Sequence, residues 1–296
     1  MHYQGKAAFL ISKPLQLMIS LCIVRQGIWD EKPVFIILDA FCGASSVADR
    51  LLSAFADLQQ PVFFKHRNQA FQYVKQKAFD HFFIDSDIGV KNYLLLLQQK
   101  IAKPSLMIHV YEEGVGTYRD DLYQGLKQRM LSALGVGTFF GGSAVVSSIF
   151  VYDDEEYMLK FPNNKHKVRK ILEPLLLSVR RNYSVLCEVF DYPGLPDVPS
   201  KSRVCNFYLS GWHLDKDFIS SIVASDSLFF VKPHPHSKDE IYLPSLYVLR
   251  GGVPFELIVV CALKLFNVVR VYHVNSSAQR YLDDKAIEFL PLSDFK

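Results

Sequence analysis

The chain has 296 residues, of which 50% are hydrophobic and 21% charged, with a formal net charge of +3. Its length exceeds one ordinary hydrophobic core and fits two domains of about 100–200 residues each, and its composition excludes a disordered chain. So small a net charge gives no indication of a nucleic-acid partner. The five cysteines form no C-x-x-C pair, which favours reduced thiols in a cytoplasmic protein over a disulfide framework or a zinc site.

The first half of the chain alternates apolar runs with segments of helical periodicity. We expect strands at 7–12, 33–38, 62–65, 81–84 and 104–111, and helices at 15–25, 45–58, 69–78, 90–100 and 122–134. Apolar strands that alternate with helices are typical of a parallel α/β sheet covered on both faces. Ligands bind such sheets beyond the carboxyl ends of the strands, where Asp39, Asp85, Glu112 and Glu113 are expected.

Two segments in the middle of the chain raise the question of membrane contact. Residues 131–152 carry no charge, but four glycines and four serines interrupt them, which favours a buried loop and a strand over a membrane span. Residues 160–181 carry seven Lys and Arg against one acid, Glu173. This basic run predicts a solvated helix face or a surface for anionic lipid headgroups or an anionic glycolipid. Within it, 168–179 are predicted to form an amphipathic helix kinked at Pro174.

A proline-rich stretch at 190–202 has little periodicity and is expected to link two domains. A second alternating unit follows, with strands at 204–210, 227–232, 246–249, 267–274 and 287–290, and helices at 215–224, 254–262 and 277–281. The predicted organisation is therefore an N-terminal Rossmann-like domain over 1–190, a linker over 191–202 and a C-terminal Rossmann-like domain over 203–296.

The acidic pair Glu112 and Glu113 is the first candidate for chemistry. Neighbouring side chains on an extended strand point to opposite sides, so only one of the two carboxylates faces a cleft easily. A carboxylate at the end of a strand, followed by Gly114, can accept a proton from a sugar hydroxyl. Two solvated acids on a surface loop are the alternative.

The second candidate is the segment 232–237, which reads Lys-Pro-His-Pro-His-Ser. Two prolines fix the backbone around His234, and a fixed imidazolium can neutralise the charge of a phosphate leaving group. An exposed proline-rich turn is one alternative. A metal site at His234 and His236 is another, although no third ligand matches it in spacing.

Two further candidates follow in the C-terminal half. Asn275, Ser276 and Ser277 stand at a strand-to-helix junction, where they either bind an anion or cap the helix. Glu256, close behind Pro254, either matches the helix dipole or accepts the hydroxyls of a ribose. His234, Glu256 and Ser276 are separated by about one αβ unit each, so these three side chains can line one crevice.

In motif order, the chain resembles the bacterial sialyltransferases, particularly the lipooligosaccharide sialyltransferase family. It also resembles their relatives, the multifunctional Pasteurella-type enzymes and the capsular polysialyltransferases. The matching motifs are YEEGVGTY at 111–118, VKPHPHS at 231–237, PFEL at 254–257 and the serine pair at 276–277, and FLISKPLQL at 9–17 is similar to the first strand and loop of the lipooligosaccharide family. The chain departs from the pattern by having Glu-Glu where many members have Asp-Asp, and Lys-Pro where some relatives have Lys-Gly.

The resemblance implies a GT-B fold, in which two Rossmann-like, doubly wound domains face a central cleft. It implies an inverting transfer of sialic acid from CMP-sialic acid to a hydroxyl of lipooligosaccharide, O-antigen or capsule, with no cofactor and no required metal. In this family pattern Glu113 is the general base and His234 assists the departing CMP. The implied donor-binding residues are Lys232, Pro235, Glu256, Ser276, Ser277, Ser210 and Gly211. The acceptor and cleft candidates are Glu112, Gly114, Ser12, Lys13, Pro14, Asp39 and Asp85.

Several alternatives stay open at this stage. A transferase for another nucleotide sugar, such as CMP-Kdo or a UDP-hexose, would use similar motifs in surface polysaccharide synthesis, and a non-catalytic subunit would bind a nucleotide sugar without turnover. The expected partners are a nucleotide sugar and a glycan acceptor, and no nucleic acid. A lipid-linked acceptor would bring a cytoplasmic protein to the inner face of the bacterial inner membrane. The acceptor sugar, the linkage position, the number of sugars added and a homodimeric state stay open.

Overall fold

The computed structural model describes residues 2–55, 58–196, 203–211, 215–223, 228–235 and 246–292. The chain divides into two compact units. Unit 1 comprises residues 1–39 and 51–174, and unit 2 comprises residues 40–50 and 175–296. The division after residue 174 falls earlier than the predicted domain end at 190, and the segment 40–50 joins the C-terminal unit. Of the predicted linker 191–202, residues 191–196 belong to unit 2 and the rest lie outside the described residues.

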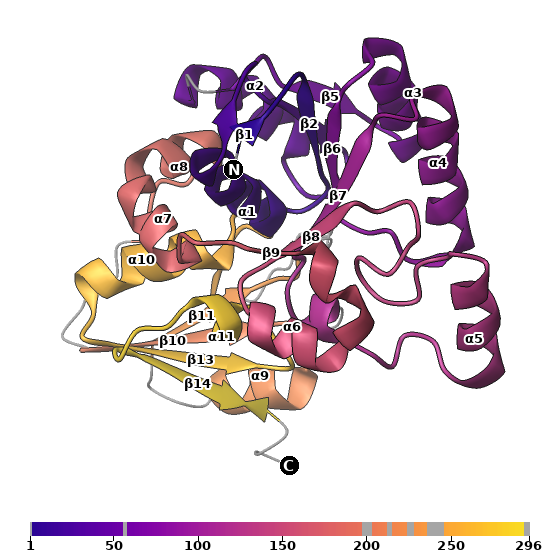
Figure 1. Ribbon diagram of the computed structural model, residues 1–296. Coiled ribbons are helices and arrows are strands. Elements are labelled where there is room, and N and C mark those ends of the chain that lie inside the picture. The colour runs from indigo at the N-terminus through magenta and orange to yellow at the C-terminus, as the bar shows by residue number, and fades with distance from the viewer. Residues whose placement is uncertain are drawn as a thin grey trace. The chain divides into compact units, whose positions relative to one another are not determined.

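Unit 1 is built on a parallel seven-stranded sheet in the order β5-β4-β2-β6-β7-β8-β9 (Figure 1). Its strands are β2 (Ala7–Ile11), β4 (Val34–Leu38), β5 (Val62–Phe64), β6 (His81–Ile84), β7 (Met107–Tyr111), β8 (Ser148–Val151) and β9 (Val168–Lys170), and β1 (His2–Tyr3) pairs with β3 (Ile28–Trp29) beside it. The helices are α1 (Pro14–Gln26), α2 (Ala44–Ala54), α3 (Arg67–Lys77), α4 (Gly89–Ala102), α5 (Gly125–Ala133) and α6 (Asp154–Lys160), with 3-10 turns η1 (Val115–Tyr118) and η2 (Pro162–Lys167). Helix α2 begins in unit 2 and ends in unit 1.

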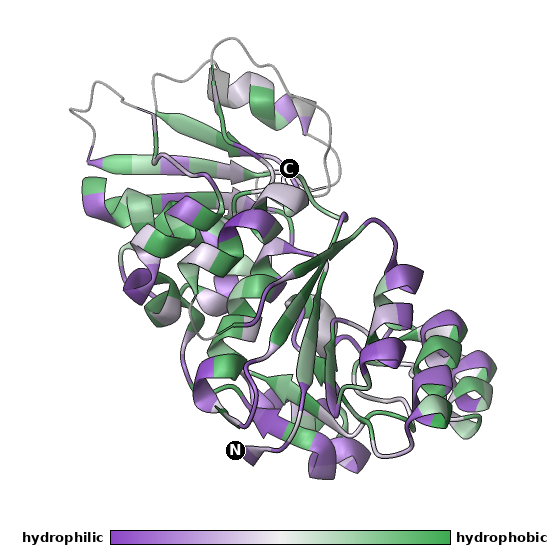
Figure 2. Ribbon diagram, turned by 90° about the horizontal axis from the view of Figure 1, so that it is seen from above, coloured by the Kyte–Doolittle hydropathy of each residue, from purple (hydrophilic) through white to green (hydrophobic). Residues whose placement is uncertain are grey.

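The strands of unit 1 follow the predicted apolar runs because both faces of the sheet are covered. Strands β2, β4 and β6 are buried along their whole length, and the strands stand out as hydrophobic in Figure 2. Strand order reverses between β2 and β6, since β4 and β5 lie on one side and β7, β8 and β9 on the other. A crevice beyond the carboxyl ends at such a switch point is where open parallel sheets bind ligands.

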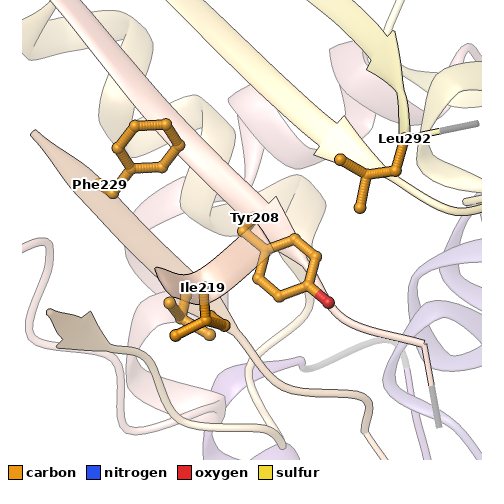
Figure 3. Packing of buried hydrophobic residues seen from close by; sticks show 5 residues of the cluster. Tyr208, Ile219, Phe229 and Leu292 are labelled. Carbon is orange, nitrogen blue, oxygen red and sulfur yellow. The ribbon is translucent and has the colours of Figure 1, made fainter. Parts of the chain in front are cut away.

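Unit 2 has a second parallel sheet, with five strands among the described residues in the order β12-β11-β10-β13-β14. Its elements are α7 (Leu175–Arg181), α8 (Tyr183–Val189), β10 (Val204–Leu209), α9 (Lys216–Val223), β11 (Phe229–Lys232), β12 (Tyr247–Val248), α10 (Phe255–Leu265), β13 (Val268–His273), α11 (Ala278–Tyr281) and β14 (Ile287–Pro291). Tyr208, Ile219, Phe229 and Leu292 pack together in a core cluster on this sheet (Figure 3). The switch point of this sheet lies between β10 and β13.

The predicted helix at 168–179 is wrong. Residues 168–170 form the edge strand β9, which pairs in parallel with β8 at Ile149↔Val168 and Val151↔Lys170. Helix α7 begins only at Leu175, directly after Pro174. Proline lacks a backbone N–H and disfavours a helical residue before it, so the apolar periodicity here is divided between a strand and a helix.

The uncharged stretch 131–152 forms the end of α5, a loop and strand β8, as expected. The buried carboxylate of Asp87 holds the loop by accepting the backbone N–H groups of Gly141 (2.9 Å) and Ser143 (2.8 Å). Among the described residues, we find no helix with the length and hydrophobicity needed to cross a membrane.

Candidate functional site

Glu113 lies just beyond β7 and is the partly exposed member of the acidic pair, with 22% of its side chain exposed. Its backbone N–H donates to Thr117 Oγ1 at 2.8 Å. Gly114 follows with φ 107° and ψ −153°, a conformation that glycine adopts most readily, and begins the turn η1. The strand end, the glycine and the turn together present one carboxylate at the edge of the sheet.

Glu112 points the other way, as the alternation of an extended chain requires. Its side chain has no exposed surface. Its carboxylate accepts the hydroxyl of Tyr118 at 2.6 Å and the backbone N–H of Tyr152 at 2.7 Å. The buried carboxylate of Glu112 ties the turn η1 to the end of β8, so Glu113 is the member of the pair that solvent reaches.

Three predicted side chains gather with Glu113 at the switch point of unit 1. Lys13 Nζ lies 3.1 Å from Glu113 Oε2. Ser12, directly after β2, donates its hydroxyl to Asp85 Oδ2 at 2.7 Å. Asp85, directly after β6, is 4% exposed. Because β2, β6 and β7 are neighbouring strands, their carboxyl ends bring together residues that lie far apart in the sequence.

Arg67, the first residue of α3, completes this cluster and has no counterpart among the sequence predictions. Its guanidinium makes a two-pronged contact with Asp85, at 3.1 Å to Oδ2 and 2.6 Å to Oδ1. Two parallel hydrogen bonds of this kind fix the orientation of both groups. A lone arginine at a helix start carries no sequence signal of such a role.

The pKa values of the two carboxylates in the cluster, Glu113 and Asp85, shift in opposite directions. Burial raises the pKa of Glu113; Lys13 opposes this, and the charge of Asp85 adds to it. Burial also acts to raise the pKa of Asp85, but the charge and hydrogen bonds of Arg67 outweigh it, so the pKa of Asp85 lies below its ordinary value. Asp85 thus stays ionised as a structural anion, whereas Glu113 is the better proton acceptor.

The remaining acceptor candidates lie at the margin of this cluster. Pro14 is the buried first residue of α1. Asp39 is exposed after β4, and its backbone N–H donates to the carbonyl of Phe64 at 3.0 Å.

In unit 2, β11 ends at Lys232, whose side chain is buried. Its Nζ donates to the carbonyls of Pro233 (3.0 Å) and Gly251 (2.8 Å). Burial lowers the pKa of Lys232 to about 7, and the charge of Glu256 opposes that shift. Glu256, in the first turn of α10, is also buried, which raises its pKa, while Lys232 opposes the rise. Lys232 and Glu256, two of the predicted donor-binding residues, thus lie inside the unit. The charge of each opposes the effect of burial on the pKa of the other.

His234 is half-buried just beyond the end of β11. Its backbone N–H donates to Ser210 Oγ at 3.1 Å, which ties the end of β11 to the end of β10. The carbonyl of Pro235 accepts the backbone N–H of Cys42 at 3.5 Å, a contact that helps to explain why residues 40–50 belong to unit 2. An added Cβ on Gly211 would meet no atom within 4 Å, so the backbone there is open. His236 and Ser237 lie outside the described residues.

The serine pair lies directly beyond β13, across the switch point from Ser210. The backbone N–H of Ser276 donates to Nδ1 of His273 at 3.1 Å, and Ser276 Oγ accepts the N–H of Ala278 at 3.2 Å. Ser277 occupies the N-cap of α11. Burial lowers the pKa of His273, so its ring is neutral at neutral pH. His273, which the sequence reasoning missed, therefore holds the backbone of the serine pair.

Among the described residues, no three His, Cys, Asp or Glu side chains gather in a way that could hold a metal ion. All five cysteines are free thiols.

No family model and no curated protein matches this chain. Two structures of the wall teichoic acid polymerase TagF resemble it over 92% of its length, with TM-scores of 0.52 and 0.50 at 11% and 10% sequence identity. The first of them carries a histidine-to-asparagine substitution and was soaked with CDPG. The chain spans 65% and 66% of the length of these two structures. The likeness shows the predicted fold class, an α/β fold of the GT-B type.

Proposed function

We propose that this protein is a glycosyltransferase that moves sialic acid from CMP-sialic acid to a hydroxyl of a cell-surface glycan. The observation that carries the proposal is Glu113, a partly exposed carboxylate whose pKa is raised by burial, at the switch point of the sheet in unit 1. A carboxylate there has the position and the basicity to accept a proton from a sugar hydroxyl. The GT-B fold and the motif order support the same reaction class.

In the proposed reaction, Glu113 takes the proton of the acceptor hydroxyl while the hydroxyl oxygen attacks the anomeric carbon of the donor sugar. The bond from that carbon to the phosphate oxygen of CMP breaks, and the configuration inverts. Glu113 ends the step protonated and CMP leaves as an anion. Lys13 keeps Glu113 ionised before the step, because a neighbouring cation favours the carboxylate form.

The donor would bind to unit 2. His234 would neutralise the charge that grows on the CMP phosphate, together with the serine pair at the switch point. Glu256 would accept the hydroxyls of the cytidine ribose, and Lys232 favours its ionised form. Ser210 would hold His234 in place through the hydrogen bond to its backbone.

The acceptor would be a surface polymer. The likeness to a wall teichoic acid polymerase favours this class of acceptor over a small free sugar. Transfer from CMP-Kdo or a UDP-hexose uses the same catalytic elements, so the donor has to be identified by experiment. A panel of CMP-sialic acid, CMP-Kdo and UDP-hexoses, with a galactose-terminated acceptor, tests this through the nucleotide released.

The proposal expects CMP release from CMP-sialic acid that depends on both the acceptor and His234. His234→Asn should lower the rate by about 10²–10³-fold, the usual effect of removing one group that stabilises developing charge. The matched control is His166→Asn, since His166 is exposed after α6. CMP binding without any acceptor-dependent release would point instead to a non-catalytic nucleotide-sugar subunit.

A further inference from the structure

Helix α5 leaves a stripe of apolar side chains in solvent. Leu126 is 73% exposed, Met130 is 58% exposed and Leu134, directly after the helix, is 67% exposed. These positions are four residues apart and so lie along one side of the helix. The structure describes all nine residues of α5, and none of them is buried. Packing within the protein therefore does not explain the stripe.

Helices α4 and α5 lie in the same part of unit 1 (Figure 1). The hydroxyl of Tyr123, just before α5, lies 3.1 Å from the position of a Cβ on Gly89, the first residue of α4. The hydroxyl of Tyr93 on α4 lies 3.5 Å from the point that a Cβ atom added to Gly135, just beyond α5, would occupy. Val90 and Leu94, in the first turns of α4, are each about half exposed. Five exposed apolar side chains, four on the two helices and Leu134 directly after α5, thus lie in one region of unit 1.

The charged side chains on the two helices themselves all have one sign, and the exposed Asp121 before α5 pairs with Arg119. Lys91, Lys127 and Arg129 are exposed, and neither helix contains an aspartate or a glutamate. Lys127 Nζ lies 5.2 Å from the ring centre of Tyr123, so its cation stays at the edge of the stripe. An apolar stripe flanked by cations, with no acid between them, complements a layer of anionic headgroups over an apolar interior.

The basic run at 160–181 does not form such a surface, although its sequence predicts a single basic face. It is divided among α6, η2, β9 and α7. Lys160, Lys170 and Arg180 pair with Glu156, Asp154 and Asp284. Lys167 donates to the carbonyls of Gly141 and Ser143. Most of these cations are engaged within the fold.

We propose that α5 and the first two turns of α4 form a docking surface for a bilayer of anionic phospholipid. The apolar stripe enters the boundary between headgroups and acyl chains, and the three cations contact the headgroups. The inference is independent of the transfer reaction, since it uses none of the residues of the candidate site.

Co-sedimentation of the whole protein with vesicles tests this surface. Wild type should bind vesicles of phosphatidylglycerol and phosphatidylcholine, and added salt should weaken the binding. The variant L126Q/M130Q/L134Q should bind at least about tenfold more weakly, because it loses the apolar anchor. The variant K127E/R129E should bind at least about 25-fold more weakly, at about fivefold for each cation near an anionic surface.

Two control variants change the same residue types elsewhere. L159Q alters an exposed leucine on α6, and K75E/K77E alters two exposed lysines on α3; both should bind vesicles as wild type does. A wild-type protein that binds neither this mixture nor phosphatidylcholine alone would overturn the proposal. So would wild-type vesicle binding by the folded L126Q/M130Q/L134Q variant. If that variant instead changes self-association in sedimentation velocity without lipid, the surface joins two copies of the chain and the lipid proposal is wrong.

Discussion

The Nζ atom of Lys13 lies 3.1 Å from the Oε2 atom of Glu113, and this ion pair joins the loop after β2 to the end of β7. Burial favours the neutral form of Glu113 and Lys13 favours its carboxylate. Arg67 lowers the pKa of Glu113 as Lys13 does, while the charge of Asp85 raises it. The balance of these groups sets the pH at which Glu113 can act as a base.

Lys13→Met should therefore shift the acidic limb of the pH profile of kcat/KM to higher pH. A base works only when ionised, and the loss of Lys13 leaves the pKa-raising effects of burial and Asp85 less opposed. The acidic limb of the pH profile of the CMP release rate, measured at saturating acceptor, should also shift to higher pH. Lys75→Met, at an exposed position of α3, is the matched control and should leave the limb unchanged. An acidic limb at the wild-type pH in the Lys13 variant would contradict this account of the ion pair.

Gly114→Ala should destabilise the protein and lower the transfer rate, because the φ of 107° at this position strains any residue with a Cβ. Strain of this kind costs about 1–3 kcal/mol in the free energy of unfolding, which urea denaturation measures. Gly116→Ala is the control, since its added Cβ would lie 3.5 Å from Glu113 Oε1, an ordinary contact. Equal stability of the two variants would show that Gly114 does not require this conformation.

Arg67→Met should lower the free energy of unfolding by about 3 kcal/mol, because it leaves the buried carboxylate of Asp85 without its cation. The pKa of Asp85 is lowered in the folded protein, so its contribution to stability is present above the ordinary pKa of aspartate and is lost as the pH falls. The double variant R67M/D85N should recover part of the loss. A double variant less stable than R67M would refute this pairing.

Glu256→Gln should weaken CMP binding by about 10–100-fold, the effect of losing a hydrogen bond to a charged group of about 1.5–3 kcal/mol. The variant should fold, because Lys232, with its pKa of about 7, can lose its proton when the carboxylate is gone. Calorimetric titration with CMP measures the affinity, with Glu188→Gln on α8 as the exposed control. Wild-type affinity in the folded Glu256 variant would rule out the ribose role.

Much of the fold could be predicted because apolar runs mark buried strands. The strands at 7–11, 34–38 and 81–84 lie where the sequence places them, and the two-residue period of an extended chain explains why Glu112 and Glu113 separate. The predicted helix at 168–179 is wrong because its apolar periodicity runs across two elements, the edge strand β9 and the helix α7. Pro174 directly precedes α7.

The rest of the site depends on contacts between distant parts of the chain. Lys13 and Glu113 meet only because β2, β6 and β7 are neighbours in the sheet. Arg67 starts a helix and His273 ends an alternating strand, and neither position has a local pattern that marks a role. The attachment of residues 40–50 to unit 2 also has no signal in composition or periodicity.

The measurement that tests the central claim most directly is CMP release from CMP-sialic acid by wild type and by Glu113→Gln, with and without a galactose-terminated acceptor. The account predicts acceptor-dependent release by wild type, and a rate about 10²–10⁴-fold lower in the variant with CMP affinity unchanged. Glu155→Gln, an exposed acid on α6, should keep the wild-type rate. An equal rate in wild type and Glu113→Gln, or no acceptor-dependent release from this donor by wild type, would contradict the account.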